Sequence, residues 1–568
     1  MDFTQSRKPP THSHNRLILQ FDYDCFYAQV HTILNPSLAP PGTPLGIKQK
    51  NILATCNYAA RARGVRKLML VTEASRLCPE LRLVDGEDLT PFRDISKKLF
   101  GFVRGFSWCG RVERLGLDEI FMDVTDLVDH NISCLNRNGL ESSFFYLSKQ
   151  DPEKGFPCDL TTFAGMVEGE VPDKPNYDDV RFLRLLLGSH LALYLRTRIE
   201  DDYGYTSTCG VSTNKVLSKL VGARHKPRNQ TTLLALTDDD VTNFMDDLKL
   251  RSVPGIGFKM ASILESHLTG HSPPENSHEC ESKLKVGQVR KSPKISPASL
   301  EKMLSGPGAE RGAGSRIWQL LHGVDPSEVK EASDVPSQIS IEDTYKGLST
   351  MPQIIEELHK LSHSLLRRMK IDLLTRGDGA LADAGEQRWL ARPRTLRLSI
   401  RSWHNMHAQN YQRASRSGPL PNFVFDLQSD MEHLAERLVS EALLPLLRRL
   451  SSEKGPKWNL QLINICAANM VMGAAEDRPG VGRNIASMFK HQDEALRPWR
   501  VMQDGSDVDD EETGERNSPP QVQDPEETPA SDTEGGWEES DNDSCPQCGH
   551  AIPAFALAAH LRYHDLEE

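Results

Sequence analysis

The sequence predicts an α+β fold with several domains, and three observations point to it. From residue 16 to about 236, short apolar runs typical of strands alternate with helical stretches, and leucines recur at helical spacing in residues 183–200. The same mixture returns from residue 338 and ends with a long apolar run at residues 458–470. A chain of 568 residues has room for roughly three to five domains with ample cores.

Four polar segments interrupt this pattern. Residues 1–15 are predicted to be disordered, and residues 128–180 are predicted to form an irregular surface insertion. Residues 266–316 are rich in Ser, Pro, Gly and Lys and are expected to be a loose insertion. Residues 476–540 have the composition of a disordered acidic linker. The folded domains are therefore expected between these segments.

Charge is divided unevenly along the chain, whose net value is −12. Residues 504–543 hold sixteen Asp and Glu against one Arg, and residues 544–568 hold three against one. Residues 1–503 therefore keep a net charge of +5, so the body is mildly basic and the tail is acidic. A basic body fits binding to a phosphate backbone.

The composition predicts an intracellular protein. Residues 1–15 lack the apolar segment of a secretory signal, and no apolar run is long enough to span a bilayer. Most of the eleven cysteines stand singly in apolar contexts and are predicted to be reduced and buried. These single cysteines are Cys25, Cys56, Cys78, Cys109, Cys209 and Cys466.

Two apolar strands carry acidic residues. The run LILQFDYDCFYAQV contains Asp22 and Asp24, and the run LGLDEIFMDV contains Asp118 and Glu119. Burying unpaired carboxylates is costly, so such residues are uncommon in strands. Carboxylates delivered to one sheet edge form a pocket suited to Mg²⁺, and two such ions can promote phosphoryl transfer. The alternative is that these residues are strand ends that face solvent.

Four motifs occur in an order that is specific to one family. They are FDYDCFYAQV, LGIKQKNILATCNYAARARGV, RLGLDEIFMDV and GVSTNKVLSKLVGARHKP. This order resembles the Y-family DNA polymerases, which copy damaged templates, and the resemblance covers roughly residues 16–475. Within that family, CFYAQV, the TCNY run and GEDLT at residues 86–90 resemble the polymerase iota subfamily most. The resemblance implies a DNA-directed DNA polymerase with a right-hand fold that performs translesion synthesis.

The resemblance also implies how the domains divide the chain. A palm, fingers and thumb would be followed by a little-finger domain that grips DNA, and the thumb would contain a helix-hairpin-helix turn. The expected boundaries are 16–25 and 88–236 for the palm, 26–87 for the fingers, 237–330 for the thumb, 335–475 for the little finger and 541–568 for a small ββα zinc finger.

By resemblance, the acidic residues form a two-metal site. Asp22 and the backbone carbonyl of Tyr23 would be ligands, Asp118 would bridge both ions, and Glu119 would complete the site near the primer 3′-hydroxyl. The two ions would be Mg²⁺, with Mn²⁺ as the alternative. Asp24 is acidic as well, but the resemblance does not make it a ligand.

The resemblance also places residues around the sugar and base of the incoming nucleotide. Tyr27 is expected beneath the sugar, where its ring would collide with a 2′-hydroxyl and select deoxynucleotides. The alternative is a tyrosine packed in the core. Gln49 and Lys50 are expected over the nascent base pair, and Ile52 and Ala54 stand where the iota subfamily typically has Leu and Val.

The triphosphate is expected to meet several donors. Tyr58 and Arg61 are three residues apart and share a face if their segment is helical. An arginine fork and a phenol suit phosphate oxygens. Lys226 would bring a further cation, and Thr55 would contribute a hydroxyl. Solvated surface charge is the alternative for Arg61 and Lys226.

Other residues are expected to contact the DNA duplex. Gly255 and Gly257, in VPGIG, would let backbone amides approach a phosphate closely. Lys215 and Lys219 are expected on a helix face near the DNA backbone or in solvent. Cationic and apolar positions alternate in residues 392–403, as in a strand with one face on a core and the other toward phosphates, or in any exposed basic strand. The cationic positions are Arg394, Arg397 and Arg401.

The carboxyl-terminal motif C-x2-C-x11-H-x3-H predicts one structural Zn²⁺. Its four ligands are Cys545, Cys548, His560 and His564. DNA-reading fingers have similar spacing, but this segment is acidic and resembles the ubiquitin-binding zinc finger of polymerase eta. Arg562 stands where that finger carries an acidic residue. Residues 482–492 resemble a sliding-clamp-binding box in part, and an ordinary amphipathic turn is the alternative.

These features together predict a monomeric nuclear enzyme without a membrane partner. Its partners would be primer–template DNA, deoxynucleoside triphosphates, and ubiquitin or a ubiquitylated sliding clamp. One alternative is a bypass enzyme of the polymerase eta type. Another is a scaffold without catalytic activity that docks on the ubiquitylated clamp. The carboxylates argue against it, because a scaffold has no physical need for side chains that repel one another.

Overall fold

The computed structural model describes residues 7–472 with gaps, together with two short strands nearer the carboxyl terminus. The gaps are residues 39, 41, 271–283, 306–310, 334, 375–387, 403–412 and 451–457. The chain divides into two units, Met1–Ala475 and Glu476–Glu568. In the second unit, β16 (Asn542–Ser544) pairs antiparallel with β17 (Ala551–Pro553). The predicted zinc ligands and residues 482–492 lie outside the described residues.

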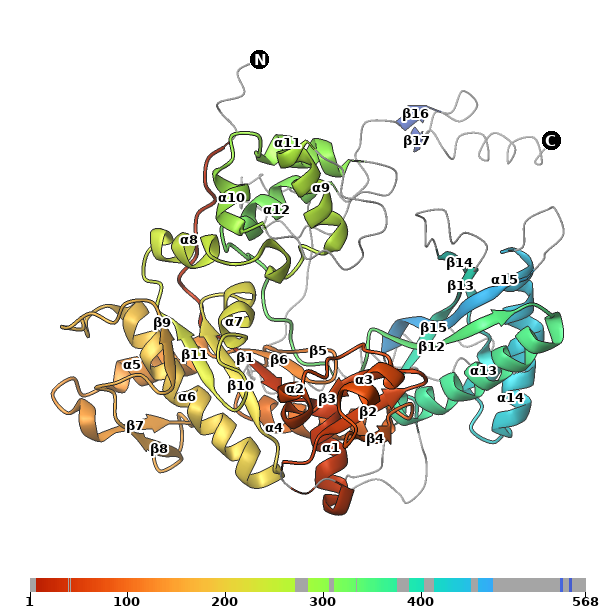
Figure 1. Cartoon of the computed structure of the whole chain (residues 1–568), viewed down its shortest axis with the longest axis horizontal. Coiled ribbons are helices and arrows are strands. Elements are labelled where there is room, and N and C mark those ends of the chain that lie inside the picture. The colour runs from red at the N-terminus through yellow and green to blue at the C-terminus, as the bar shows by residue number, and fades with distance from the viewer. Residues whose placement is uncertain are drawn as a thin grey trace, which may run out of the picture. The chain divides into compact units, whose positions relative to one another are not determined.

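The first unit contains a six-stranded sheet in the order β5-β6-β1-β10-β11-β9 (Figure 1). Its strands are β1 (Ile18–Tyr23), β5 (Val112–Leu115), β6 (Glu119–Asp123), β9 (Met166–Glu168), β10 (Ser207–Ser212) and β11 (Gln230–Leu233). β1 runs antiparallel to both of its neighbours, β6 and β10. Every residue of β1 except Asp22 is buried, which explains its nearly continuous apolar sequence.

Helices pack against this sheet and supply the other side chains of its hydrophobic core. They are α4 (Thr90–Arg104), α5 (Thr125–Cys134), α6 (Val180–Tyr203) and α7 (Lys215–Gly222). α6 begins after Asp179, whose carboxylate accepts a hydrogen bond from the Arg181 backbone N–H, and it ends at Gly204 in the left-handed conformation. The polar stretch 128–180 is more regular than predicted, because it supplies β9 to the sheet and forms a hairpin of β7 (Ser143–Tyr146) and β8 (Gly155–Cys158).

A smaller sheet lies between β1 and α4 in sequence. Its strand order is β3-β2-β4, with β2 (Leu45–Gln49), β3 (Ile52–Cys56) and β4 (Arg82–Asp85). The helices of this segment are α1 (Phe26–Leu34), α2 (Tyr58–Ala62) and α3 (Val71–Leu77). Leu53, Cys56, Ala60, Val65 and Ala74 form part of a separate small core, so this segment has packing of its own.

A group of helices follows residue 236, consisting of α8 (Asp238–Asp246), α9 (Phe258–Thr269), α10 (Val286–Lys291), α11 (Pro297–Leu304) and α12 (Ala313–Leu321). The prediction of a loose insertion over residues 266–316 is wrong for residues 284–305. Val286, Val289, Ile295 and Leu300 are fully buried in the core that α8, α9 and α12 share. Their apolar side chains outweigh the Ser, Pro and Lys residues between them.

Residues 7–15, which belong to the segment 1–15 that was predicted to be disordered, contact the helical group. The Arg7 guanidinium donates to the carbonyls of Arg290 and Ser292, and the Trp318 indole N–H donates to the carbonyl of Lys8. The Arg16 guanidinium donates to carbonyls beyond α12. Hydrogen bonds with the folded part of the chain therefore order this polar segment.

A four-stranded antiparallel sheet completes the first unit, in the order β12-β15-β13-β14 (Figure 1). Its strands are β12 (Gln338–Leu348), β13 (Ala391–Ser402), β14 (Ala414–Pro419) and β15 (Leu460–Met472). The helices are α13 (Met351–Leu373), α14 (Met431–Arg437), a π-helical turn (Leu438–Leu443) and α15 (Leu444–Arg448), and short 3₁₀ helices occur at Pro36–Leu38, Leu140–Ser142, Leu250–Ser252 and Asn422–Phe425. Leu396, Leu398 and Ile400 of β13 are buried in a core shared with α13 and α14.

The structure bears on the predictions about buried cysteines and about membrane-spanning segments. Cys25, Cys56, Cys78 and Cys209 are free and buried, as predicted, and so is Cys466. Cys109 is exposed, which contradicts the prediction, because it lies in the bend between α4 and β5 rather than inside a strand. Among the helices that the structure describes, none has the length and apolar content needed to cross a membrane.

Candidate active site

The predicted acidic residues meet at one edge of the six-stranded sheet. β1 ends where the antiparallel strand β6 begins, and Asp22 stands directly opposite Glu119 in the register. The Tyr23 backbone N–H donates to the carbonyl of Asp118 at 2.9 Å, which fixes the residue just before β6 against the end of β1. Side chains directly opposite each other in an antiparallel pair project to the same face. The register therefore puts the Asp22 and Glu119 side chains on one face, and Asp118, which directly precedes β6, lies close enough to feel the charges of both.

The electrostatics of this edge favour a bound cation. Burial, and then the charges of Asp22 and Glu119, raise the pKa of Asp118 to about 6. Lysines partly offset the charge, since the Lys226 ammonium lies 2.6 Å from Asp22 and the Lys219 ammonium lies 2.5 Å from Glu119. Within the described residues, no three acidic, Cys or His side chains converge as a finished metal site. The all-oxygen donor set nevertheless fits Mg²⁺, which would replace the lysines as counterion.

Lys219 does not lie where the sequence predicted. We expected it on a DNA-facing or solvent-exposed helix face together with Lys215. Instead, Lys219 pairs with Glu119, and Lys215 pairs with Glu113 at 3.0 Å and donates to the carbonyl of Glu328. The sequence shows that α7 follows β10, and the sheet order shows that β10 neighbours β1. Without that sheet order, the sequence could not show that Lys219 faces the acidic edge.

Tyr27 lies in the first turn of α1 and next to the acidic edge. Its ring stacks on Phe92 of α4, with centroids 4.0 Å apart and planes 9° from parallel. Burial, followed by the charge of Asp118, raises the pKa of Tyr27. The stacked ring has little rotational freedom, so it presents a fixed surface beside the carboxylates.

Tyr58 and Arg61 both lie on α2, as their spacing allowed. The Asn57 side chain caps this helix by accepting from the Ala60 N–H, and it also binds the backbone of Leu45, which joins α2 to β2. The Arg61 guanidinium lies 4.8 Å from the Tyr58 ring centroid, and its Nε donates to the carbonyl of Cys56. Both donors are therefore held on one face of the helix.

Gln49 ends β2 and Lys50 follows it, and both side chains, which we expected over the nascent base pair, are bound to other groups of the protein. The Gln49 amide donates to the carbonyl of Gly86 at 2.8 Å. Lys50 has a positive φ of 52° and its ammonium binds Asp343 and the carbonyl of Thr344, both on β12. Thr55 lies on β3 opposite Ile47 and is only partly buried.

The glycines and arginines predicted to contact DNA lie on elements other than the strands of the acidic edge. Gly255 has a φ of 92°, and a side chain there would meet Leu320, whereas Gly257 caps α9 with ordinary extended backbone. Arg394, Arg397 and Arg401 lie on β13, and alternation puts Arg397 and Arg401 on the face opposite Leu396 and Leu398. Arg397 donates to the Gln338 side chain at 3.2 Å.

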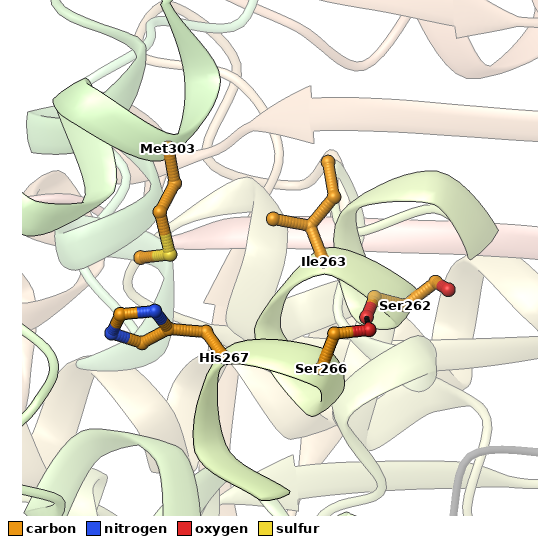
Figure 2. Close-up of a pocket in the computed structure, with 5 residues that line it drawn as sticks. All are labelled: Ser262, Ile263, Ser266, His267 and Met303. Carbon is orange, nitrogen blue, oxygen red and sulfur yellow. Dashed lines mark hydrogen bonds between the residues drawn. The ribbon is translucent and has the colours of Figure 1, made fainter. Parts of the chain in front are cut away.

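A pocket of about 410 Å³ opens between α9 and α11 (Figure 2). It is lined by Ser262, Ile263, Ser266, His267 and Met303, and Figure 2 shows the Met303 side chain extending toward the His267 ring. None of these residues is acidic, so the pocket offers no carboxylate to a hard cation. It is a feature of the helical group and includes none of the predicted site residues.

Known proteins are similar in sequence to this chain over most of its length. Residues 21–223 match the impB/mucB/samB family, and residues 336–479 match the C-terminal domain of that family. The chain is 33% identical to DNA polymerase iota of Homo sapiens over 462 residues, which covers 81% of this chain and 53% of the human protein. It is 33% identical to DNA polymerase iota of Mus musculus over 466 residues, covering 82% of this chain and 55% of the mouse protein.

A more distant relative comes from a second subfamily. The chain is 28% identical to DNA polymerase eta of Drosophila melanogaster over 295 residues, which covers 46% of this chain and 32% of the fly protein. The chain thus spans about half the length of the curated iota polymerases that it matches. Because the two family matches together cover more than half of the chain, the protein belongs to the impB/mucB/samB family, the Y-family polymerases that its sequence motifs predicted.

Proposed function

We propose that this protein is a DNA-directed DNA polymerase that copies damaged templates. The observation that carries the proposal is the meeting of three carboxylates, Asp22, Asp118 and Glu119, with Tyr27 and Lys226 at one sheet edge. Family membership and the likeness to iota polymerases support the same activity. A scaffold would gain nothing from this cluster of like charges, because such a cluster destabilises a fold that never binds a cation.

The proposed metal ligands are Asp22, Asp118, Glu119 and the carbonyl of Tyr23. Two Mg²⁺ ions held there would activate the primer 3′-hydroxyl and neutralise charge at the transferring phosphoryl group. Lys226 binds Asp22 at 2.6 Å, so a triphosphate and Asp22 would compete for its ammonium. Lys219 would keep Glu119 neutralised before the cations enter.

The side chains around this edge would orient and select the nucleotide. Tyr58 and Arg61 would hold phosphate oxygens from α2, with Thr55 nearby on β3, while Lys226 would do so from the loop after α7. Tyr27 would exclude a 2′-hydroxyl, because its stacking on Phe92 prevents the ring from moving aside.

The polymerase domains follow from this assignment. The six-stranded sheet would be the palm, the β3-β2-β4 sheet the fingers, the helical group after residue 236 the thumb, and the β12-β15-β13-β14 sheet the little finger. The thumb would bind the duplex backbone through its turn at Gly255 and Gly257. The little finger would bind phosphates through Arg394, Arg397 and Arg401.

Primer extension by the purified full chain tests this function. Templates carrying each normal base and a set of damaged bases would be copied with Mg²⁺ and single deoxynucleotides. We expect template-dependent addition of one nucleotide opposite normal and damaged bases. Failure to extend any primer, by a chain that binds primer–template DNA, would leave a scaffold as the better account.

We further propose that Cys545, Cys548, His560 and His564 bind one Zn²⁺ and that this finger recruits the enzyme through ubiquitin in the nucleus. The C-x2-C-x11-H-x3-H spacing supports the zinc site. The expected ubiquitin affinity is weak, because the interface is small and Arg562 replaces the usual acidic residue.

The zinc proposal predicts a metal content that can be measured. The full chain should contain one zinc ion, and the double variant Cys545→Ser/Cys548→Ser should contain none and lose binding to labelled ubiquitin. Primer extension should be unchanged, since the finger lies outside the catalytic domains. Zinc that remains bound in the double variant would contradict the ligand assignment.

A further inference from the structure

Asp24 lies just beyond the end of β1, two residues from Asp22, and is only 4% exposed. It is followed by Cys25, whose φ of 45° is left-handed and which caps α1. Were β1 to continue, Asp22 and Asp24 would share a face of the sheet. The left-handed backbone at Cys25 ends the strand. Hydrogen bonds then hold the Asp24 carboxylate in place.

Both oxygens of Asp24 are engaged by residues distant in sequence. Oδ2 accepts from the Arg228 backbone N–H at 2.9 Å and from the Thr206 hydroxyl at 3.0 Å. Oδ1 faces the Tyr58 hydroxyl, which donates to it at 3.4 Å. Because these three donors already engage both oxygens, we do not count Asp24 among the proposed metal ligands.

Two of the three groups that donate to the Asp24 carboxylate belong to different elements around the proposed triphosphate site. Tyr58 lies on α2 with Arg61, and Arg228 lies two residues after Lys226 in the loop between α7 and β11. One buried carboxylate thus contacts the helix that carries Tyr58 and Arg61 and the loop that carries Lys226. A buried hydrogen bond to a charged group is among the stronger polar contacts in proteins.

We infer that Asp24 is a positioning residue that sets the separation of the two phosphate-binding elements, α2 and the loop 226–228, and that it touches neither substrate nor metal. The inference rests on the proposed function for the identity of the ligand, a nucleoside triphosphate. Asp24 acts through Tyr58 and through the backbone at Arg228, so its loss weakens the grip on phosphates and leaves the acidic edge intact.

Two measurements on the full chain test this inference. The first is calorimetric titration with magnesium tripolyphosphate, which reports phosphate binding without catalysis. The second is steady-state primer extension, which gives KM and kcat for a correct deoxynucleotide. We expect Asp24→Ala to weaken tripolyphosphate binding and raise KM by about tenfold each, with kcat within about threefold of the wild type.

Three further variants separate positioning from a general structural role. Asp24→Asn keeps an acceptor for the Arg228 N–H and should recover most of the loss. Asp24→Ala combined with Tyr58→Phe should cost less than the product of the single effects, because the two residues act through one contact. Thr206→Val removes a hydrogen bond to Asp24 that leads to neither phosphate-binding element, and it should change tripolyphosphate binding by less than about twofold.

The outcomes distinguish this inference from the proposed function. Unchanged tripolyphosphate binding in Asp24→Ala overturns the inference, as does an equal loss in Thr206→Val or a fall in kcat with KM unchanged. If Asp24→Ala does not fold, Asp24→Ser, whose shorter side chain cannot reach both elements, takes its place, and unchanged tripolyphosphate binding in that variant overturns the inference. A chain whose tripolyphosphate binding depends on Asp24 but which extends no primer supports the inference and overturns the polymerase function.

Discussion

Replacing Asp118 with asparagine is expected to stop nucleotide addition while leaving DNA binding in place. Asp118 is the proposed bridge between two cations, so its loss should lower the rate of addition by at least about 10³-fold. Duplex affinity should stay within about twofold, because the proposed DNA contacts lie on the helical group and on β13. Single-turnover extension and a fluorescence-based DNA titration measure the two quantities.

The same variant should also be more stable than the wild type in the absence of metal. The raised pKa of Asp118 reflects an ionised form disfavoured by burial and by two neighbouring carboxylates. Asparagine has the same shape without the charge, so the free energy of unfolding should rise by about 1 kcal/mol at neutral pH. Glu153→Gln, in the β7–β8 turn, is the matched control and should change neither property. Undiminished extension by Asp118→Asn would contradict the proposed mechanism.

Replacing Tyr27 with alanine is expected to admit ribonucleotides. The ring should be the barrier to a 2′-hydroxyl, so its removal should raise ribonucleotide incorporation by about 10²-fold and change deoxynucleotide use far less. Competing ribonucleotide and deoxynucleotide triphosphates in one extension reaction would give the ratio of kcat/KM values directly.

Tyr27→Phe is the control for this second prediction. It keeps the ring and its stacking on Phe92 and should therefore keep the discrimination. Removal of the ring also leaves Phe92 without its stacked neighbour, so the melting temperature of Tyr27→Ala must be measured alongside. Equal ribonucleotide use by the wild type and Tyr27→Ala would leave Tyr27 as a packed aromatic residue.

The meeting of the acidic residues was predictable because it depends on strand ends. Asp22 ends an apolar run and Asp118 precedes another, and antiparallel pairing of β1 with β6 brings those ends together. The spacing of Tyr58 and Arg61 likewise determined their common helix face once α2 formed. Local pattern was sufficient for the helix face, whereas the prediction that the carboxylates meet also rested on the family resemblance, because the residues alone left solvent-facing strand ends as the alternative.

Contacts between distant elements were not predictable in this way. Lys219 forms an ion pair with Glu119, 100 residues away, and Lys50 forms one with Asp343, 293 residues away. Composition also misled where a few apolar residues decide packing, since Val286 and Leu300 are buried within a polar stretch. Neither a long-range ion pair nor a sparse core leaves a periodic signal in the sequence.

Iron-directed cleavage of the chain tests the central claim, that the ends of β1 and β6 together hold divalent cations, most directly. Fe²⁺ binds oxygen-ligand sites that take Mg²⁺, and with ascorbate and peroxide it cuts the backbone beside the bound ion. We predict cuts near Asp22 and near Asp118, both suppressed by excess Mg²⁺ and absent from Asp118→Asn. Cuts at only one of these places, or cuts unaffected by Mg²⁺, would contradict the two-strand metal site.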